Sequence, residues 1–364
     1  MTRQVIAAPL SATRTRRTEW LYADRIPLRT GTILAGQGGI AKSTIISTII
    51  AKATRGELPG TFMGTPVTVA MISPEDDIES VLVPRLIAAG ANLDNVVYLS
   101  VSATESGRSW TTLPNIVDDL PSMGEVITEH GIRLLVVDPL VSIMSGNSIS
   151  QSDVRRNFDP LSALAKAHDF AVLAVAHFGK SGDRAGDRLS GSHAFRDIAR
   201  VVIVAAVDEE TGLRVVTVDK SNYSPEQPSD AYSIDSVDVQ LDDGYTQSVG
   251  HAQLVGASDV TVQEILDRER DGSSLSGDMQ SIIAEVGNHP DGVEAAAVAE
   301  AVGLPIEKVR KYLNRAFDRG DIEKPKRGLF TPLSRVPSVP SVPSSGHKGH
   351  IRHISYRGDC PGFG

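Results

Sequence analysis

A glycine-rich turn set between an apolar run and a helical pattern constrains this chain more than any other stretch. The run and turn read Gly31-Thr32-Ile33-Leu34-Ala35-Gly36-Gln37-Gly38-Gly39-Ile40-Ala41-Lys42-Ser43-Thr44, and the helix is expected over 43–55. A strand, a glycine-rich turn and a helix in this order are the context of a phosphate-binding loop. Backbone N–H groups of such a loop surround phosphate oxygens, and the positive end of the helix adds to the attraction. A glycine-rich turn that merely precedes a helix is the plainer alternative.

The expected nucleotide-binding residues are contiguous: Gly36, Gln37, Gly38, Gly39, Ile40, Ala41, Lys42, Ser43 and Thr44. The glycines among them are expected to supply the positive φ angles that the loop requires. The Lys42 ammonium would reach the β and γ phosphates of ATP, and the Ser43 hydroxyl would hold Mg²⁺. Ala41 stands where this motif normally has its second fixed glycine, and we expect it to be tolerated with a negative φ.

Length, charge and cysteine content narrow the class of protein. A chain of 364 residues suggests about two domains. The net charge of −9 argues against a protein that coats nucleic acid, although it leaves room for a local basic site. The single cysteine, Cys360, excludes a disulfide framework and fits a reducing cytoplasm. No apolar stretch is long enough to span a membrane, and no signal peptide is recognisable, so we expect a cytoplasmic protein without a membrane partner.

Apolar runs alternate with helical patterns up to about residue 220. Runs of continuous rather than alternating apolar residues indicate a mainly parallel sheet covered on both faces, and therefore an α/β core. The expected strands are 32–34, 67–72, 96–99, 134–137, 171–176, 201–206 and 213–218, and the expected helices are 43–55, 78–89, 114–130 and 158–168. The segment 235–254 is interpreted either as a closing hairpin or as part of a linker.

The chain is predicted to have five parts: a mobile arm (1–18), the α/β core (19–255), a linker (256–275), a small helical unit (276–333) and a disordered Pro/Ser-rich tail (334–364). The small unit is predicted to be a winged helix-turn-helix, with three helices and a two-stranded wing. Its third helix and wing are basic, which favours duplex DNA as a partner; the basic residues are Lys308, Arg310, Lys311, Arg315, Arg319, Lys324, Lys326 and Arg327. A winged helix that binds protein is the alternative.

Acidic residues follow two of the predicted strands. Asp138 ends the apolar strand 134–137, which is the position of the aspartate that holds Mg²⁺ in phosphate-loop ATPases. Strand 67–72 leads into Glu75, Asp76 and Asp77. An acid that ends the strand next to the phosphate-loop strand can polarise the attacking water, so Glu75 is our candidate base and Asp76 the alternative. All three acids also fit the N-terminus of the following helix.

A histidine and a long loop follow the strand 171–176. His177 could sense the γ phosphate and pass the signal to the Gly/Ser-rich loop 178–193, which carries Lys180, Arg184 and Arg188. A solvated surface loop with an incidental histidine is the simpler interpretation.

Taken together, these positions resemble one family. The loop 36–43, Ser73-Pro74-Glu75-Asp76, Asp138, Ala176-His177 and Asp219-Lys220-Ser221-Asn222-Tyr223 are similar to RecA-type ATPases of the RepA hexameric helicase group, found on plasmids and phages. The resemblance covers residues 20–225. It implies a RecA-like P-loop NTPase fold, ATP and Mg²⁺ as ligands, Glu75 as catalytic glutamate and His177 as γ-phosphate sensor.

The same resemblance implies basic residues at the nucleotide. Arg85 lies where the group carries an arginine near the nucleotide, and Arg200 best matches the arginine that the group supplies across a subunit interface. Lys220 is a second candidate for that interface, and Arg196 or Arg188 could serve in place of Arg200. The implied assembly is a homo-oligomer, possibly a hexamer, with single-stranded DNA at its core.

The leading hypothesis is therefore an oligomeric DNA-acting ATPase, a RepA-like replicative helicase or related replication protein. An ATP-switched DNA-binding regulator or partition-type protein is one alternative, and a RecA-type recombination or repair mediator is another. Partition ATPases have a lysine just before the paired glycines, whereas this chain has Gln37 there.

Overall fold

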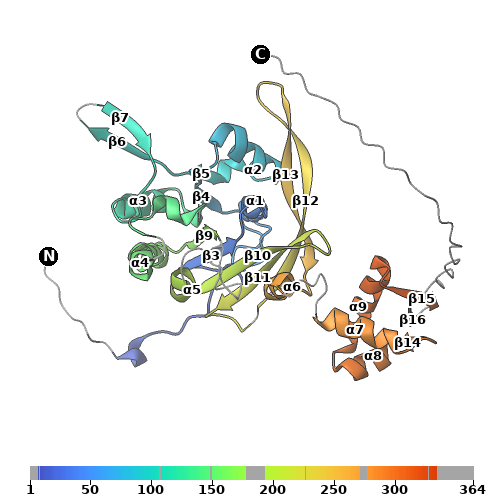
Figure 1. Cartoon of the computed structure of the whole chain (residues 1–364). Helices are drawn as coiled ribbons and strands as arrows, with labels where there is room; N and C mark the ends of the chain where they lie inside the picture. The colour runs from blue at the N-terminus through green and yellow to red at the C-terminus, as the bar shows by residue number, and fades with distance from the viewer. Residues whose placement is uncertain are drawn as a thin grey trace, which may run out of the picture. The chain divides into compact units, whose positions relative to one another are not determined.

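The computed structural model describes residues 7, 9–105, 108–147, 150–177, 193–225, 227–270, 277–326 and 328–333. The predicted tail (334–364) and most of the predicted loop (178–192) lie outside these residues. The chain divides into two compact units, Met1–Gly277 and Asp278–Gly364 (Figure 1), which are described separately.

A large mixed sheet runs through the first unit. Within the described residues it has nine strands, in the order β13-β12-β11-β10-β3-β9-β8-β4-β5. The strands from β10 to β5 pair in parallel, and β11, β12 and β13 pair antiparallel. The mainly parallel α/β sheet is thus confirmed. The strands are β3 (Gly31–Gly36), β4 (Thr68–Ile72), β5 (Val96–Tyr98), β8 (Ile132–Val137), β9 (Ala171–His177), β10 (Val201–Asp208), β11 (Leu213–Ser221), β12 (Ser229–Gln240) and β13 (Thr246–Ala257).

Both faces of the parallel strands are buried. In β8, Leu134 and Val136 enter one hydrophobic cluster, while Leu135 and Val137 enter the cluster on the opposite face, because successive side chains of a strand point to opposite sides. Helices α1 (Lys42–Thr54) and α2 (Val83–Ala88) contribute to the first cluster. Helices α3 (Leu120–Glu129), α4 (Gln151–Ala167) and α5 (His193–Ile198) contribute to the second. Strands with two buried faces need apolar residues at every position, which explains the continuous runs.

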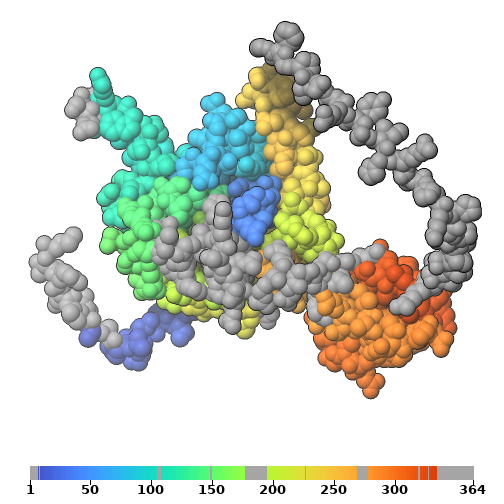
Figure 2. Space-filling model, in the orientation of Figure 1, coloured from blue at the N-terminus to red at the C-terminus, as the bar shows by residue number. Residues whose placement is uncertain are grey.

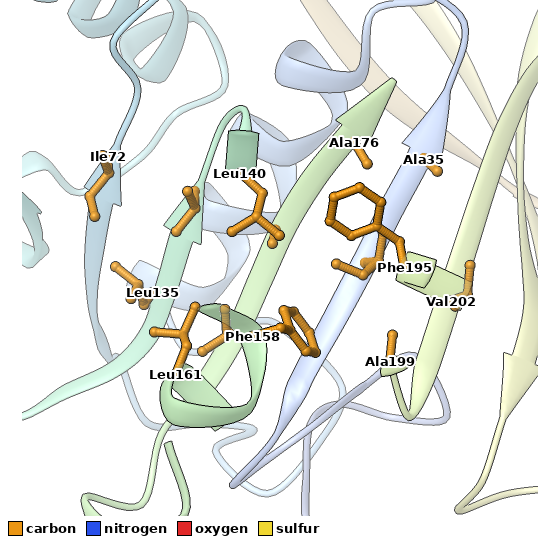
Figure 3. Packing of buried hydrophobic residues seen from close by; sticks show 14 of the residues in the cluster. Ala35, Ile72, Leu135, Leu140, Phe158, Leu161, Ala176, Phe195, Ala199 and Val202 are labelled. Atoms are coloured by element: carbon orange, nitrogen blue, oxygen red, sulfur yellow. The ribbon is translucent and has the colours of Figure 1, made fainter. Parts of the chain in front are cut away.

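Large side chains from the helices fix the second cluster against the sheet. Figure 3 shows Phe158 and Leu161 of α4 and Phe195 of α5 over the strands. A Cβ atom on Gly31 would lie 2.3 Å from Cζ of Phe158, so the ring packs directly on the backbone of β3. This packing holds the strand that leads into the glycine-rich loop.

Several helices begin or break at other residues than expected. The predicted helix 78–89 consists of a π-helical turn, η2 (Ile78–Leu82), followed by α2, since Pro84 has no N–H to continue a regular ladder. Helix α3 begins at Leu120 rather than near 114, because Oδ1 of Asn115 accepts the N–H groups of Val117 and Asp118 in a turn. Helix α4 begins earlier than predicted, at the Ser150 cap. Short 3-10 turns occur at η1 (Leu10–Ala12), η3 (Leu93–Asn95) and η4 (Leu140–Ile143).

Two antiparallel pairs were not predicted. The strands β1 (Trp20–Tyr22) and β2 (Ile26–Pro27) pair with each other, and so do β6 (Val101–Glu105) and β7 (Arg108–Thr112). The segment 235–254, for which a hairpin and a linker were both considered, lies in the long hairpin of β12 and β13.

The stretch predicted as a linker (256–275) contains the helix α6 (Val262–Arg270). Val262, Ile265 and Leu266 are buried in the second cluster of the first unit. The guanidinium of Arg268, only 8% exposed, lies 2.7 Å from Oε1 of Glu210 and 3.4 Å from Oδ1 of Asp208. The sequence of α6 is rich in charged residues and was therefore interpreted as a linker. One side of the helix packs on the core through the ion pairs of Arg268 rather than through apolar contacts.

The second unit consists of three helices and a small antiparallel sheet. The helices are α7 (Gly277–Gly287), α8 (Ala295–Val302) and α9 (Ile306–Arg319), and the strands, in the sheet order β14-β16-β15, are β14 (Val293–Glu294), β16 (Leu329–Pro332) and β15 (Ile322–Lys326). Its buried residues include Ile282, Val298, Leu313 and Phe330. Among the helices described in either unit, none has the length and apolar character needed to cross a membrane.

Candidate nucleotide site

The glycine-rich loop joins the carboxyl end of β3 to the first turn of α1. Ala41 caps the helix with φ 69° and ψ 32°, so the expectation of a negative φ at this residue is wrong. The chain must turn sharply to enter α1, and a left-handed residue makes that turn, which is why glycine is usual there. Gly39 also has a positive φ, of 79°, whereas Gly36 and Gly38 do not, contrary to the prediction for all three glycines.

Position 36 requires glycine because a larger side chain would not fit there, and not because of its φ angle. A Cβ atom there would lie 2.5 Å from Cδ1 of Ile40 and 2.7 Å from the carbonyl oxygen of Ala205 in β10. Added Cβ atoms on Gly38 and Gly39 would meet nothing within 4 Å. The loop is therefore packed tightly against the sheet at its start and is open at its tip, as a cradle for phosphate oxygens must be.

Lys42 lies over the start of the loop. Its Nζ donates to the carbonyl oxygens of Gly36, at 2.9 Å, and Gln37, at 2.7 Å, and the residue is only 5% exposed. Burial lowers the pKa of Lys42, while the nearby charges of Asp138 and Glu75 raise it. A buried ammonium that is bonded to neutral carbonyl groups can exchange them for phosphate oxygens, which are stronger acceptors.

Asp138 and Ser43 meet although 95 positions separate them. The Ser43 hydroxyl donates to Oδ2 of Asp138 over 2.6 Å, and Asp138 is buried. Both side chains lie at the edge where the parallel strands have their carboxyl ends, which is where α/β sheets bind ligands. A hydroxyl and a carboxylate side by side are hard oxygen ligands of the kind that Mg²⁺ prefers, so these two residues fit the ion expected there.

The three acids after β4 have different surroundings. Oδ1 of Asp77 accepts the backbone N–H of Ser80, at 2.8 Å, and the Ser80 hydroxyl, at 2.6 Å, and these bonds lower the pKa of Asp77. Asp76 forms an ion pair with Arg85. Glu75 is exposed and makes no hydrogen bond or ion pair with another described residue, but its charge acts on Lys42. Of the three acids, Glu75 is therefore the one whose presence is not explained by a bond to another described residue.

The order of the strands differs from one premise of the prediction. β4 was expected to neighbour β3, but the sheet order β3-β9-β8-β4 separates them. The strand that leads to the candidate base lies next to β8, which leads to Asp138, so Glu75 follows a strand on the Asp138 side of the site. β9 is the neighbour of β3 on that side, and its last residue, His177, pairs with Gly36. The side chain of His177 lies outside the described part of the chain.

Two residues predicted to act in trans, Arg200 and Lys220, lie toward the amino ends of the parallel strands, away from the carboxyl ends that lead to the loop and to Asp138. Val201 of β10 pairs in parallel with Thr32, and Lys220 of β11 pairs with Val202. Arg200 therefore stands level with Gly31 at the amino end of β3, about 16 Å along the strand direction from Gly36. Among the described residues, neither Arg200 nor Lys220 forms a hydrogen bond or an ion pair with the glycine-rich loop, and Arg85 is engaged by Asp76.

The basic surface at that edge is partly neutralised. Arg196 donates from Nε to Oδ2 of Asp219 over 2.9 Å, and Nζ of Lys220 donates to the carbonyl oxygen of Arg196 over 2.6 Å. Burial and the charge of Arg196 lower the pKa of Lys220. Arg200 is exposed. A bound anion would counter the repulsion that Lys220 experiences from its arginine neighbours.

A buried asparagine that the sequence analysis did not single out supports the segment after Asp138. Asn157 of α4 is fully buried; its Oδ1 accepts the N–H of Ser145, and its Nδ2 donates to the carbonyl oxygens of Ser145 and Asp153. The sequence could have indicated the role of Asn157, because an asparagine on the apolar face of a helix requires buried hydrogen-bond partners.

Comparison with known proteins agrees with this geometry. A protein-family model described as an AAA domain matches residues 2–183, which is half of the 364-residue chain. No curated protein matches the chain. The matched region contains the glycine-rich loop, Asp138 and Glu75. The chain therefore belongs to the AAA domain family of P-loop ATPases.

Proposed function

We propose that this protein is an ATP-hydrolysing, DNA-acting motor, an oligomeric replication protein or helicase similar to the RepA group. The observation that carries the proposal is the arrangement at the carboxyl ends of the parallel strands. Lys42 and the bonded pair of Ser43 and Asp138 lie there, and the charge of Glu75, which has no ion-pair partner among the described residues, acts on Lys42. A charge for the phosphates, oxygen ligands for a metal ion and a free base are the parts that phosphoryl transfer to water needs.

In this proposal each residue has one task. Lys42 leaves the two loop carbonyls and binds the β and γ phosphates of ATP. Ser43 and Asp138 hold Mg²⁺, which would neutralise developing charge on the phosphates when bound. Glu75 accepts a hydrogen bond from the attacking water and orients it. We assign the role of γ-phosphate sensor to His177, because it ends β9, which lies between β3, the strand that leads into the loop, and β8, the strand that leads to Asp138.

The arginine of a neighbouring copy completes the site in this proposal. The position of Arg200 far from its own loop supports a role in trans, with Lys220 beside it. Subunits with Arg200→Ala keep a complete loop of their own, and subunits with Lys42→Ala keep the arginine. A mixture of the two variants should therefore regain ATPase activity that neither has alone. A mixture as inactive as its components, with oligomers present, excludes Arg200 as the trans residue.

The second unit is proposed to be a winged helix that binds duplex DNA. Three helices and a three-stranded sheet with a β15–β16 wing support this assignment. A groove of about 490 Å³ between α8, α9 and the wing is lined by Arg310, Asn314 and Lys324, with Phe330 at its side. Nζ of Lys324 donates to Oδ1 of Asn314 over 2.8 Å and lies 5.1 Å from the Phe330 ring. Lys308 and Arg310 are paired with Asp278 and Glu307, and Glu294 also lines the groove, so Lys324 is our first candidate for a contact with a phosphate backbone.

A strand-displacement assay tests the proposal. The full chain with ATP and Mg²⁺ should separate a forked duplex, and Glu75→Gln should bind ATP and DNA without separating the strands. ATP-dependent DNA binding without displacement would instead favour a switched regulator or partition-type protein, and filaments on single strands would favour a recombination mediator. A folded protein without ATPase activity, alone or with DNA, would refute the proposal.

A further inference from the structure

The β12–β13 hairpin carries a cluster of negative charge and a free sheet edge. Residues 229–257 contain no lysine or arginine. Four acids of the hairpin, Asp235, Asp238, Asp242 and Asp243, are exposed. A fifth, Asp230, is buried and is bonded through both oxygens to Arg25, each at 2.5 Å. Figures 1 and 2 show the hairpin, in yellow, reaching past the other strands at the surface of the first unit. Its outer half is therefore an acidic surface.

The outer strand of this hairpin is open to pairing. β13 is the last strand of the large sheet and is twelve residues long, whereas β5 at the other edge has three. Proteins usually protect a long edge with lysine, proline or a bulge; β13 has neither lysine nor proline, and its register shifts only near its end, at Val255, so that residues 246–254 pair regularly with β12. Two large apolar residues of the hairpin are also exposed, Tyr245 by 67% and Val255 by 59%. The carbonyl oxygen of Ala252 accepts the hydroxyl of Thr48 in α1, and β13 pairs with no described strand other than β12. A strand edge beside exposed apolar side chains is typical of a surface that another strand covers.

The arm that precedes β1 has the opposite charge. Residues 1–18 contain Arg3, Arg14, Arg16 and Arg17 and no acid. The last three are exposed, and none forms an ion pair with a described residue; Glu19, just after them, pairs with Arg29 instead. Leu10 is 87% exposed. The stretch Thr13-Arg14-Thr15-Arg16 alternates β-branched and basic residues, as a strand with one charged face does.

We propose that the arm of one copy of this chain adds as a strand to the β13 edge of another copy. An added strand would lie two strand spacings, about 10 Å, from β12. Asp238 of β12 pairs with Ser248 of β13, and its neighbour Ser236 pairs with Gly250. Ser248 and Gly250 are small and share the face of Asp238, so they leave room for an arginine side chain of the added strand to cross β13 and meet that acid; Asp235 lies on the opposite face, behind His251. Extended, the 18-residue arm spans about 60 Å, which is enough to reach a neighbouring copy.

This inference rests on the oligomeric state in the proposed function, but it names a surface that the proposed function does not need. The occupant is another copy because the opposite charges are equal in number, four on each side, and are supplied in equal amounts by every subunit. Backbone pairing gives the affinity, and charge sets the register and the rate of association.

Charge reversal in both directions tests the inference. The arm variant is Arg14→Glu, Arg16→Glu and Arg17→Glu; the hairpin variant is Asp235→Lys, Asp238→Lys and Asp242→Lys. Asp243 is left in place because its Oδ1 accepts the N–H of Tyr245 in the turn. The control is Asp118→Lys, Glu125→Lys and Glu129→Lys, an equal change of charge on an exposed surface elsewhere. Sedimentation velocity over a range of protein concentrations measures assembly, and thermal unfolding checks that the variants fold.

Each variant alone should raise the concentration for half-assembly by about 10- to 100-fold, and the control should leave it unchanged. An equimolar mixture of arm and hairpin variants should assemble again, because a glutamate arm meets a lysine hairpin on the other chain. Failure of the mixture to recover, or normal assembly of the single variants, would overturn the inference while the oligomer of the proposed function stands. A folded wild-type protein that stays monomeric at every concentration, with and without ATP, would overturn both.

Discussion

Replacing Ala41 by glycine should stabilise the protein, although such a change inside a helix is normally destabilising. Ala41 is held at φ 69° and ψ 32°, in the left-handed region. An L-residue pays about 1–2 kcal/mol to adopt this conformation, and glycine does not. Glycine makes the unfolded chain more flexible, which costs about 0.4–1 kcal/mol. The free energy of unfolding should therefore rise by about 0.5–1 kcal/mol, as measured by urea denaturation.

The matched control is Ala51→Gly in the helix that follows. Ala51 is fully buried in the interior of α1. There the same substitution should lower the free energy of unfolding by about 1 kcal/mol from helix propensity and by a similar amount from the lost methyl group. The two variants should shift the urea midpoint in opposite directions. If Ala41→Gly destabilises as much as Ala51→Gly does, the left-handed turn before α1 is incorrect and so is the explanation given for the loop.

Three further predictions concern charged groups. Glu75→Gln should abolish hydrolysis and keep ATP binding in a filter-binding assay, whereas Asp76→Asn should chiefly lower thermal stability by releasing its arginine; the reverse outcome exchanges their roles. Arg268→Ala should lower the free energy of unfolding by about 3–5 kcal/mol in urea, because it removes the positive charge from beside two buried carboxylates. Arg156→Ala, at a side chain 64% exposed, should change this free energy by less than about 1 kcal/mol. Burial lowers the pKa of Lys42, so on raising the pH the folded protein loses this proton before the unfolded chain, whose lysine has the ordinary value of 10.5. The free energy of unfolding of the wild type, relative to that of Lys42→Met, should therefore rise as the pH increases from the lowered pKa of the folded protein to 10.5. If this free energy has the same pH dependence in both proteins, Lys42 does not carry a buried charge.

The parts of the site that were predictable are those that local sequence determines. A strand, a glycine-rich turn and a helix follow one another directly, so residues 36–44 could be identified from their order alone. A general rule predicted that Ser43 and Asp138 could meet. Both residues follow parallel strands, and the carboxyl ends of parallel strands lie on the same side of a sheet. The structure places them 2.6 Å apart. Continuous apolar runs likewise predicted the doubly covered sheet.

Other features depend on neighbours that the sequence does not specify. Periodicity locates β4 but does not say which strand it pairs with, so the expected place beside β3 was wrong. The φ angle of Ala41 is set by the turn into α1, and the identity of this residue does not indicate that its φ angle is positive. Helix α6 resembled a linker because Arg268 finds its partners about 60 residues earlier in the chain. The edge at which Arg200 lies likewise required the pairing of β10 with Thr32.

The most direct test of the account is the rate of ATP hydrolysis by the full chain and by Lys42→Ala, with Mg²⁺, with and without single-stranded DNA. The account predicts that the wild-type protein hydrolyses ATP and that DNA accelerates it. It also predicts that a folded Lys42→Ala protein loses at least about a hundredfold in rate, because the cation that holds the β and γ phosphates is gone. Unchanged turnover in folded Lys42→Ala would show that the site is misassigned, and a wild-type rate that DNA does not alter would contradict a motor that acts on DNA.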